Sequence, residues 1–413
     1  MTETHKLVSD EEWRECPDCG MLISLTSHRP GLIAECPRCL CVLWRMRRVG
    51  ITFPLACAIA GLLFYSFALI APLLEIKAYG RFAMAHIETG PLRLVSSGWQ
   101  IIGALVFLVT LIIPGLKLGI ITITLLGIET HFPRRPLKIL FRWYTMLSPW
   151  AMIDVYLLGF LVAYTRLTGM FTVHIDTALY ALIGLMMAMG ATDAGLDQEI
   201  VWRRLHDTET SSRTVGLHAL GCATCGLVNH APENNRCRRC DAPLHPRKAE
   251  SFARTWAFTI AAACLYIPAN IYPFMNITNL AQTQSYTIMG GIAELVNAGL
   301  WPLALLVFFA SITIPLLKLV GLAYMLISTQ RGHSSFLQAR TRTYRILDFI
   351  GRWSMIDIFM VSILVALVHF GQFANVTANI GAICFAAVVV LTIFAINAFD
   401  PRLMWDNYEE PAI

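Results

Sequence analysis

The sequence predicts an all-α polytopic membrane protein with about eight transmembrane helices in two tandem four-helix repeats, each preceded by a small cysteine-bearing domain. Three observations predict this class. The chain is 56% hydrophobic and 14% charged over 413 residues, with a mean hydropathy of +0.59, which excludes an ordinary soluble domain. It contains several long apolar segments. Its cysteine motifs and several of its apolar motifs also occur twice, about 200 residues apart.

The apolar segments define the expected spans, because a helix crosses a bilayer with roughly 20 mainly apolar residues. Eight such runs lie near residues 52–74, 99–127, 143–165, 171–192, 255–275, 301–328, 353–370 and 376–398. In the fourth run only 177–192 is free of charge, so its outer boundary stays open near His174 and Asp176. Residues 1–50 are polar and carry cysteines, and we therefore expect no cleavable signal peptide.

The distribution of basic residues predicts the orientation, because short loops rich in Lys and Arg stay in the cytoplasm. The N-terminal segment, the 128–142 loop, the 193–254 linker, the 329–352 loop and the tail hold 26 of the 32 Lys and Arg residues. We therefore expect both termini and the linker to be cytoplasmic. The net charge of +5 follows from this topology, and no nucleic-acid surface is needed to explain it.

The chain is an internal duplication. Paired cysteine motifs precede each set of four apolar runs, FLVTLIIPGLKL (107–118) matches FFASITIPLLKL (308–319), and WAMID (150–154) matches WSMID (353–357). Because each unit has an even number of spans, the two copies are expected to be parallel repeats. The expected domains are the first cysteine domain (1–50), a first transmembrane module (51–200), a linker with the second cysteine domain (201–250), and a second transmembrane module with a short cytoplasmic tail (251–413).

Eight of the twelve cysteines form two CxxC…CxxC sets. The sets are Cys16, Cys19, Cys36 and Cys39, and Cys222, Cys225, Cys237 and Cys240. This spacing suits two structural four-cysteine zinc sites in small cytoplasmic zinc ribbons, whose folding energy would come largely from the metal. Two alternatives stay open. One is redox chemistry of the thioredoxin type, although the βαβ pattern typical of it is missing, and the other is an iron–sulfur or rubredoxin-like iron site.

Each repeat also carries a lysine and an aspartate within apolar segments, where one charge costs roughly 2.5–3.5 kcal/mol. Lys318 follows Pro315, which is expected to kink its helix, and Asp357 lies on the next helix. We predict a Lys318–Asp357 pair, with a Lys117–Asp154 pair as its counterpart. The alternative, above all for the first repeat, is a static ion pair that only fixes helix packing.

The second repeat collects more polar groups at membrane depth than the first. The additional groups are Ser311, Thr313, Ser354 and Thr392. Acid, amine and hydroxyl groups in a partly wet bundle interior suit a proton relay, so we expect the second repeat to hold the working site. The alternative is that the hydroxyls bond only to their own helix backbone.

Further motifs are PANIYP (268–273), IPLLK (314–318), GRWSMID (351–357) and FDPRLMWD (399–406). Together with the paired cysteines they resemble the paraquat-inducible protein A (PqiA/LetA) family over nearly the whole chain. The resemblance implies a bacterial inner-membrane subunit of an intermembrane transport system for phospholipids. It implies a periplasmic MCE-domain tunnel protein, expected to be an oligomeric ring, as the partner. It also implies tetraspanin-like four-helix modules, and a polar network of Lys318, Asp357 and Thr392.

The sequence contains no GxxxxGK[ST] nucleotide loop, so energy for transport would have to come from the proton gradient. We expect proton movement through the intramembrane network to drive lipid loading or extraction without covalent chemistry, which means that the protein is not an enzyme. Two alternatives stay open. The chain could be a membrane-bound zinc or redox sensor with the ribbons as detectors, or a passive anchor for the tunnel protein.

Overall fold

The computed structural model describes residues 12–25, 31, 33–45, 47, 50–78, 81–168, 172–205, 219–230, 235–279, 282–333, 335–367 and 374–406. These residues contain eight helices long and apolar enough to cross a membrane, which confirms the predicted number. The first four spans, module 1, are α1 (Thr52–Ile70), α3 with α4 (Gln100–Phe107, Ile113–Glu129), α5 with α6 (Arg134–Leu147, Ile153–Thr168) and α7 (Thr177–Gly195). The last four, module 2, are α9 (Ser251–Ile271), α11 with α12 (Trp301–Phe308, Ile314–Gln330), α13 with α14 (Leu337–Gly351, Ile356–Leu367) and α15 (Ile380–Ala398).

Two segments predicted as cytoplasmic loops, 128–142 and 329–352, are instead largely helical. They form α5 and α13, which run into the third and seventh spans. In α5 the apolar side chains of Leu137, Phe141 and Tyr144 are buried three or four residues apart, while Arg134 and Arg135 on the other face stay exposed. An amphipathic helix of this kind lies at the edge of an apolar layer. The segment was predicted as a loop because of its basic residues. The open boundary of the fourth span is also settled, since Asp176 caps α7 by accepting a hydrogen bond from Thr177 N (2.6 Å).

Pro315, which was predicted to kink the sixth span, and its counterpart Pro114 in the second span both follow π-helical turns. These turns are η1 (Leu108–Ile112) and η3 (Phe309–Thr313), each ending two residues before its proline. A tyrosine from the first helix of each module donates its hydroxyl to a carbonyl of the turn, Tyr65 to Leu111 O at 2.9 Å and Tyr266 to Ile312 O at 3.2 Å. These hydroxyls satisfy backbone acceptors in the disturbed helix segment, where proline cannot donate.

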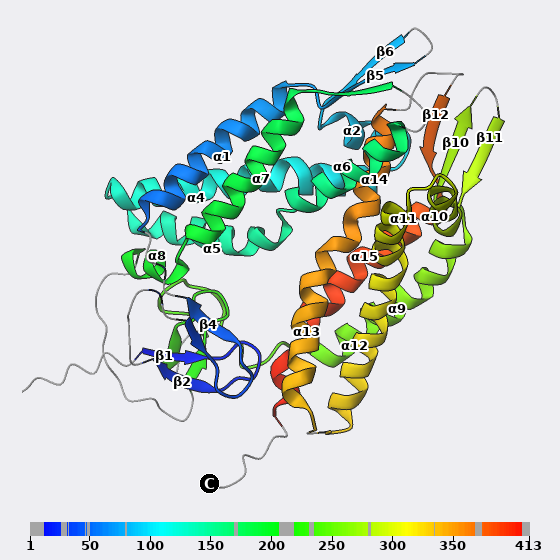
Figure 1. The fold of residues 1–413 in the computed structure, drawn as a ribbon. Coiled ribbons are helices and arrows are strands. Elements are labelled where there is room, and N and C mark those ends of the chain that lie inside the picture. Colours follow the sequence, from blue (N-terminus) through cyan, green and yellow to red (C-terminus); the bar gives the residue numbers. More distant parts are fainter. Residues whose placement is uncertain are drawn as a thin grey trace, which may run out of the picture.

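Each module carries a small antiparallel sheet that the sequence did not predict. In module 1 the strand order is β6-β5-β7 (Arg81–Ala85, Leu74–Ala78, Thr172–Ile175), and in module 2 it is β11-β10-β12 (Gln282–Tyr286, Met275–Asn279, Ala374–Ala378). Each sheet joins the end of the first span to the start of the fourth, so the first and fifth spans end earlier than predicted. Both sheets lie at the end of the molecule opposite the cysteine domains (Figure 1).

The two modules meet through the equivalent helices α6 and α14. Gly159 of α6 lies at the closest approach, since a Cβ there would be 2.9 Å from Phe359 Cβ and 3.0 Å from Ile356 O. Helix α14 also packs against α2 (Thr89–Ser96), where a Cβ on Gly90 would lie 2.6 Å from Ser362 O. Small residues let helices in a membrane approach closely. Helix α14 therefore connects the packing of the two modules.

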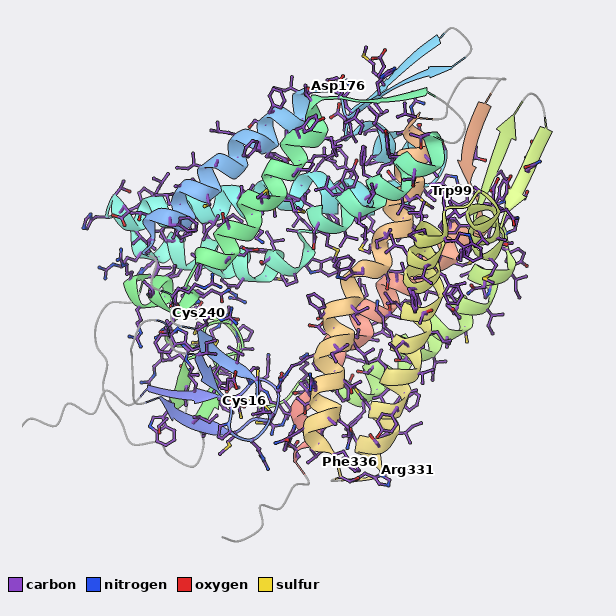
Figure 2. All side chains as sticks on the ribbon, in the orientation of Figure 1. Cys16, Trp99, Asp176, Cys240, Arg331 and Phe336 are labelled. Carbon is purple, nitrogen blue, oxygen red and sulfur yellow. The ribbon has the colours of Figure 1, made fainter. Side chains whose placement is uncertain are left out.

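The cysteine domains consist of short hairpins. Ribbon 1 (residues 12–45) contains β1 with β2 (Glu12–Glu15, Leu22–Leu25) and β3 with β4 (Ile33–Glu35, Val42–Arg45), and ribbon 2 (residues 219–244) contains β8 with β9 (Ala219–Gly221, Val228–His230). Figure 2 shows Cys16 and Cys240 at the end of the molecule opposite Asp176 and Trp99.

The two ribbons dock against each other and against both modules. Ribbon 1 packs against module 2, where Trp405 shares its apolar cluster and Arg345 of α13 donates to Asp18 at 2.6 Å. Ribbon 2 packs against module 1, where Arg239 donates to both carboxylate oxygens of Glu199 on α8 (Gln198–Leu205), at 2.9 and 3.0 Å. Ribbon 1 also contacts module 1, where Arg14 pairs with Glu199 and Trp44 Nε1 donates to Asp197 Oδ1 at 3.3 Å, so the ribbons link the two modules.

Candidate functional site

Both predicted cysteine sets converge into compact clusters. All eight side chains are buried, and the four Sγ atoms of each set lie within 4.8 Å of one another. The nearest Sγ–Sγ pairs are Cys16–Cys39 at 3.4 Å, and Cys19–Cys36, Cys222–Cys240 and Cys225–Cys237 at 3.5 Å. Four thiolates around one tetrahedral Zn²⁺, with Zn–S bonds of about 2.3 Å, would lie about 3.8 Å apart, so the clusters fit such an ion. Within the described ranges, no other Cys, His, Asp or Glu side chains form a group of this kind.

Each CxxC pair sits in a tight turn that points both thiols to one place. In ribbon 1, Cys16 N donates to Met21 O at 2.9 Å and Gly20 N donates to Cys16 O at 2.9 Å, with Gly20 in the left-handed region (φ 74°). Hydrogen bonds from the neighbouring thiols, Cys225 foremost, lower the pKa of Cys222 to about 7. Hydrogen bonds from Cys222 and Cys225 likewise hold the pKa of Cys237 well below its ordinary range. Hydrogen bonds with Cys222 foremost raise the pKa values of Cys225 and Cys240, so Cys222 and Cys237 are the thiols of ribbon 2 that most readily become thiolates, the form that binds a metal.

In module 1, Lys117 pairs with Asp193 of α7 instead of the predicted Asp154. The Nζ–Oδ2 distance is 2.7 Å, and the Tyr144 hydroxyl donates to the other carboxylate oxygen of Asp193 at 2.7 Å. The Lys117 side chain is 4% exposed, whereas that of Asp193 is 43% exposed. The prediction failed because α5, rather than α6, packs beside α4, which leaves Asp154 beyond a break in the third span. Asp193 lies just after the fourth apolar run, and the equivalent position of the second repeat is Ile396. This difference between the repeats was the signal in the sequence that could have identified Asp193 as a candidate partner.

In module 2, Lys318 is completely buried and hydrogen-bonds to neutral groups. Its Nζ donates to Gly351 O at 2.9 Å and to Ser354 Oγ at 3.0 Å. Gly351 and Ser354 occupy the sequence positions that Ser148 and Ala151 have in module 1. The structure thus brings together the predicted residues Lys318 and Ser354, in an arrangement that differs from the ion pair of module 1. The predicted Lys318–Asp357 pair stays a prediction.

The other predicted network residues are buried near the same helices. Asp357 is 2% exposed in the first turn of α14. Ser311 is fully buried in the π-helical turn η3, and its hydroxyl has no hydrogen-bond partner among the residues described. Thr392 is also fully buried, and its hydroxyl donates to Val389 O of its own helix at 2.9 Å. The contact of Thr392 agrees with the alternative that the hydroxyls bond only to their own helix backbone. The Ser311 hydroxyl, in contrast, makes no hydrogen bond within the described residues.

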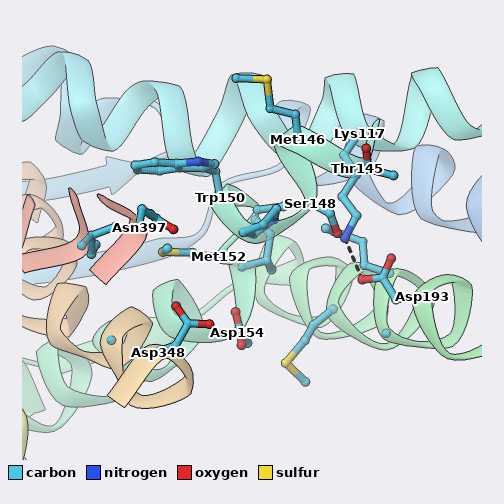
Figure 3. A pocket seen from close by; sticks show the side chains of 18 of the residues that line it. Lys117, Thr145, Met146, Ser148, Trp150, Met152, Asp154, Asp193, Asp348 and Asn397 are labelled. Carbon is cyan, nitrogen blue, oxygen red and sulfur yellow. Dashed lines mark hydrogen bonds and ion pairs between the residues drawn. The ribbon is translucent and has the colours of Figure 1, made fainter. Parts of the chain in front are cut away.

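A pocket of about 770 Å³ lies between the two modules. Module 1 lines it with Lys117, Thr145, Met146, Ser148, Pro149, Trp150, Ala151, Met152, Ile153, Asp154, Met186, Met189, Gly190 and Asp193, and module 2 with Asp348, Gly351, Ile393, Ile396 and Asn397. Figure 3 shows the Lys117–Asp193 ion pair toward one side of the pocket and Asp154 and Asp348 projecting from two different helices. Asp348 and Asn397 were not predicted as site residues, since neither lies in a repeated motif.

The model of the family described as "Paraquat-inducible protein A" matches the chain twice, over residues 51–206 and 252–409. The chain is 30% identical to "Lipophilic envelope-spanning tunnel protein A" of Escherichia coli (strain K12), over 96% of the chain and 92% of that protein. It is also 30% identical to "Intermembrane transport protein PqiA" of the same strain, and 26% identical to "Probable intermembrane transport protein" of Haemophilus influenzae, in both cases over 96% of each chain. No solved structure is significantly similar to the chain.

These relatives are similar along almost their whole length, and both halves of the chain match one family model. The double match agrees with the internal duplication. The eight candidate spans and the two four-cysteine clusters complete the resemblance that the motifs indicated. The chain belongs to the paraquat-inducible protein A family.

Proposed function

We propose that this chain is a bacterial inner-membrane subunit of an MCE-type system that moves phospholipids between membranes, and that proton movement through module 2 drives lipid loading or extraction. A periplasmic MCE-domain tunnel protein is the proposed partner. The chain makes and breaks no covalent bonds in this function, and its two cysteine clusters hold structural zinc. The names of the relatives, which include intermembrane transport and an envelope-spanning tunnel, support the transport class.

The proposed orientation places the ribbons and both termini in the cytoplasm and the two sheets in the periplasm. It is supported by the concentration of Lys and Arg in the segments next to the ribbons. The sheets would then form the surface that faces the tunnel protein. The proposed domains are 1–50, 51–200, 201–250 and 251–413, and the two family matches over 51–206 and 252–409 support the division into modules.

The observation that carries the proton-coupling proposal is the complete burial of Lys318, which hydrogen-bonds to neutral acceptors and interacts electrostatically with the Asp348 carboxylate. An ammonium group at membrane depth costs roughly 2.5–3.5 kcal/mol, and Gly351 O and Ser354 Oγ are hydrogen-bond acceptors without a charge. A group in such a place can exchange its proton at a smaller cost than one held in a tight ion pair. Asp357 and Ser311 are buried in the neighbouring elements α14 and η3.

Proton exchange in this network would alter the contact between the modules. Asp357 is in the first turn of α14, and α14 packs against α6 and α2 of module 1. A change of one charge at Lys318 or Asp357 changes the helix packing that is most favourable in a low-dielectric interior. Helix α14 would transmit that change to module 1, and so to the space between the modules.

The test is growth under membrane stress of a strain that depends on this protein, at matched membrane abundance of each variant. We expect Asp357→Asn, Lys318→Met and Thr392→Val to fail. The matched control is Thr259→Val, since Thr259 is also a buried hydroxyl of module 2 that bonds its own helix, at 2.7 Å from Thr255 O. In addition, the internal pH of liposomes that contain the wild-type protein should fall when an inward proton gradient and acceptor lipid are supplied.

Growth of all three variants at the wild-type rate would remove the proton-coupling proposal and favour a passive anchor. The sensor alternative is separated by Cys16→Ser and Cys222→Ser. A sensor should lose its response while remaining folded, whereas structural zinc predicts loss of folded protein from the membrane.

A further inference from the structure

One arginine of module 2 reaches into the proposed metal site of ribbon 1. Arg345 lies on α13, and its Nη2 donates to Cys39 Sγ at 3.4 Å and to Cys39 O at 2.9 Å. The same guanidinium group donates to Leu40 O at 3.2 Å and to the Asp18 carboxylate at 2.6 Å. Gln338, near the start of α13, donates at 2.8 Å to the carbonyl oxygen of the residue before Cys39. A helix of the membrane module therefore holds the turn that carries a metal-binding thiol and contacts the thiol itself.

The duplication offers an internal comparison for this contact. Arg142 of α5 has the position of Arg345 in the first repeat, and it donates to Asp241 O in the equivalent turn of ribbon 2 at 3.4 Å. Among the residues described, this is the one hydrogen bond of Arg142. Thr224 replaces Asp18 in ribbon 2, so the carboxylate that orients Arg345 has no counterpart there. Both ribbons meet an arginine of an amphipathic helix, but of these two arginines only Arg345 contacts a thiol.

The contact with Cys39 has a chemical consequence for metal binding. Four thiolates and one divalent ion leave a net negative charge, which N–H donors to the sulfur atoms stabilise. Such a donor also fixes the orientation of the ligand. Because Cys39 is buried, the guanidinium group acts where solvent screens charges only weakly. Loss of Arg345 should therefore weaken the metal site of ribbon 1 and leave that of ribbon 2 unchanged.

Helix α13 also carries two groups that contact or influence the buried lysine of module 2. Asp348 lies three residues after Arg345, about one helical turn, and interacts electrostatically with the Lys318 ammonium group. Gly351, the last residue of α13, accepts the hydrogen bond from Lys318 Nζ at 2.9 Å. A displacement of α13 therefore changes the surroundings of Lys318.

We propose that Arg345 is a positioning residue of the metal site in ribbon 1, and that metal binding there holds α13 of module 2 in place. The inference rests on the proposed structural zinc and goes beyond it, because it gives ribbon 1 a regulatory action on the membrane network. When the four thiols of ribbon 1 separate, Arg345 and Gln338 lose their acceptors and α13 is released. The two metal sites are therefore not equivalent.

The first test observes each metal site separately in the full-length, zinc-loaded protein. N-ethylmaleimide modifies thiols as a chelator withdraws the metal, and peptide mass spectrometry gives the rate at Cys39 and at Cys240. In Arg345→Gln we expect Cys39 to be modified about 10- to 100-fold faster than in the wild type, which is the range for loss of a hydrogen-bond partner of a metal ligand. The rate at Cys240 should stay within about twofold.

Arg142→Gln is the matched control, since Arg142 contacts ribbon 2 but no thiol. Both thiols should react within about threefold of the wild-type rate, because one long hydrogen bond contributes little. Arg345→Lys keeps the charge and a donor but not the planar fork, so an intermediate rate at Cys39 is expected. This variant retains a cation beside Asp18 and serves if Arg345→Gln does not fold.

The second test measures amide hydrogen exchange of α13 by mass spectrometry. Removal of the metal from the wild type should speed exchange in α13 by about tenfold or more, because the helix opens more readily once it is released. Zinc-loaded Arg345→Gln should already exchange α13 at about the rate of the metal-free wild type, and the chelator should add little.

An unchanged rate at Cys39 in Arg345→Gln, or equal acceleration at Cys39 and Cys240, would overturn the positioning role. Equal exchange of α13 before and after metal removal would overturn the link to module 2. Either result leaves the proposed structural zinc standing as long as Cys39 is protected before the chelator is added. If Cys39 reacts at once without a chelator, ribbon 1 holds no metal, and the structural zinc is refuted together with the inference.

Discussion

Glu199 is the residue of module 1 that binds both ribbons at once. Its carboxylate is 2% exposed and accepts hydrogen bonds from Arg14 of ribbon 1, from Arg239 of ribbon 2 at 2.9 and 3.0 Å, and from Arg203 of its own helix at 3.1 Å. The side chains of Arg14 and Arg239 are 12% and 7% exposed, whereas that of Arg203 is 42% exposed and can turn to water. Glu199→Gln would therefore leave two buried guanidinium groups without the anion that holds them.

The expected magnitude follows from this burial. Removing one partner of a buried ion pair costs about 3–5 kcal/mol, and we take the lower end because the glutamine side chain of the variant keeps one acceptor oxygen. If loss of metal from ribbon 2 requires undocking, a cost of about 3 kcal/mol raises the undocked population, and so the rate of metal loss, by about 100-fold. The assay follows release of zinc from the full-length protein to an excess of a coloured chelator.

Glu129→Gln is the matched control. Glu129 pairs with Arg204 on the same module, but that ion pair is 3.5 Å long and its side chains are 47% and 50% exposed. An exposed pair contributes about 0–1 kcal/mol, so zinc release from this variant should stay within about fivefold of the wild type. If Glu199→Gln releases zinc no faster than Glu129→Gln, the charge cluster does not hold the ribbons, and the reasoning from its burial is wrong.

Two further predictions concern the module contact and the metal. Gly159→Val should destabilise the protein by about 1–3 kcal/mol through overpacking, because its Cβ would lie 2.9 Å from Phe359 Cβ, whereas a Cβ at Gly119 has no atom within 4 Å; the check is the midpoint of thermal unfolding in detergent, where an equal midpoint for Gly159→Val and Gly119→Val would contradict the close approach. Elemental analysis of the purified protein should find about two zinc ions per chain, and about one for any soluble Cys36→Ala or Cys237→Ala variant. Iron in place of zinc, or a metal content that these substitutions do not change, would contradict the structural zinc sites.

Much of the architecture follows from local patterns in the sequence. Eight apolar runs of sufficient length had to become spans, because backbone groups in a bilayer can be satisfied only within helices or closed sheets. The clustered thiols of Cys16 to Cys39 and of Cys222 to Cys240 followed from spacing, since the CxxC turn is short and sets the direction of both side chains. Helices α5 and α13 were missed because their basic residues, such as Arg134 and Arg135, resemble those of a loop when only charge is considered.

The candidate polar sites could be predicted only in part. Residues with a costly charge, Lys117 and Lys318, were identifiable one by one. Their partners were not, because Asp193 lies 76 residues from Lys117 and its selection depends on which helices pack together. The same holds for Ser354, which was recognised as polar but whose contact with Lys318 requires the turn η4 (Arg352–Met355) between α13 and α14.

The sequence by itself determined the membrane class, the number of spans, the duplication and the residues of both cysteine clusters, because each of these depends on neighbours a few residues apart or on composition. The tertiary structure alone decided how the ribbons dock on the modules, the Lys117–Asp193 pair, the packing of α14 against module 1 and the pocket between the modules. The two modules are similar in sequence, so local patterns do not specify which surfaces of the ribbons and the modules meet. The choice is made by complementary side chains such as Glu199 with Arg239, and Asp18 with Arg345, which meet only when the whole chain is folded.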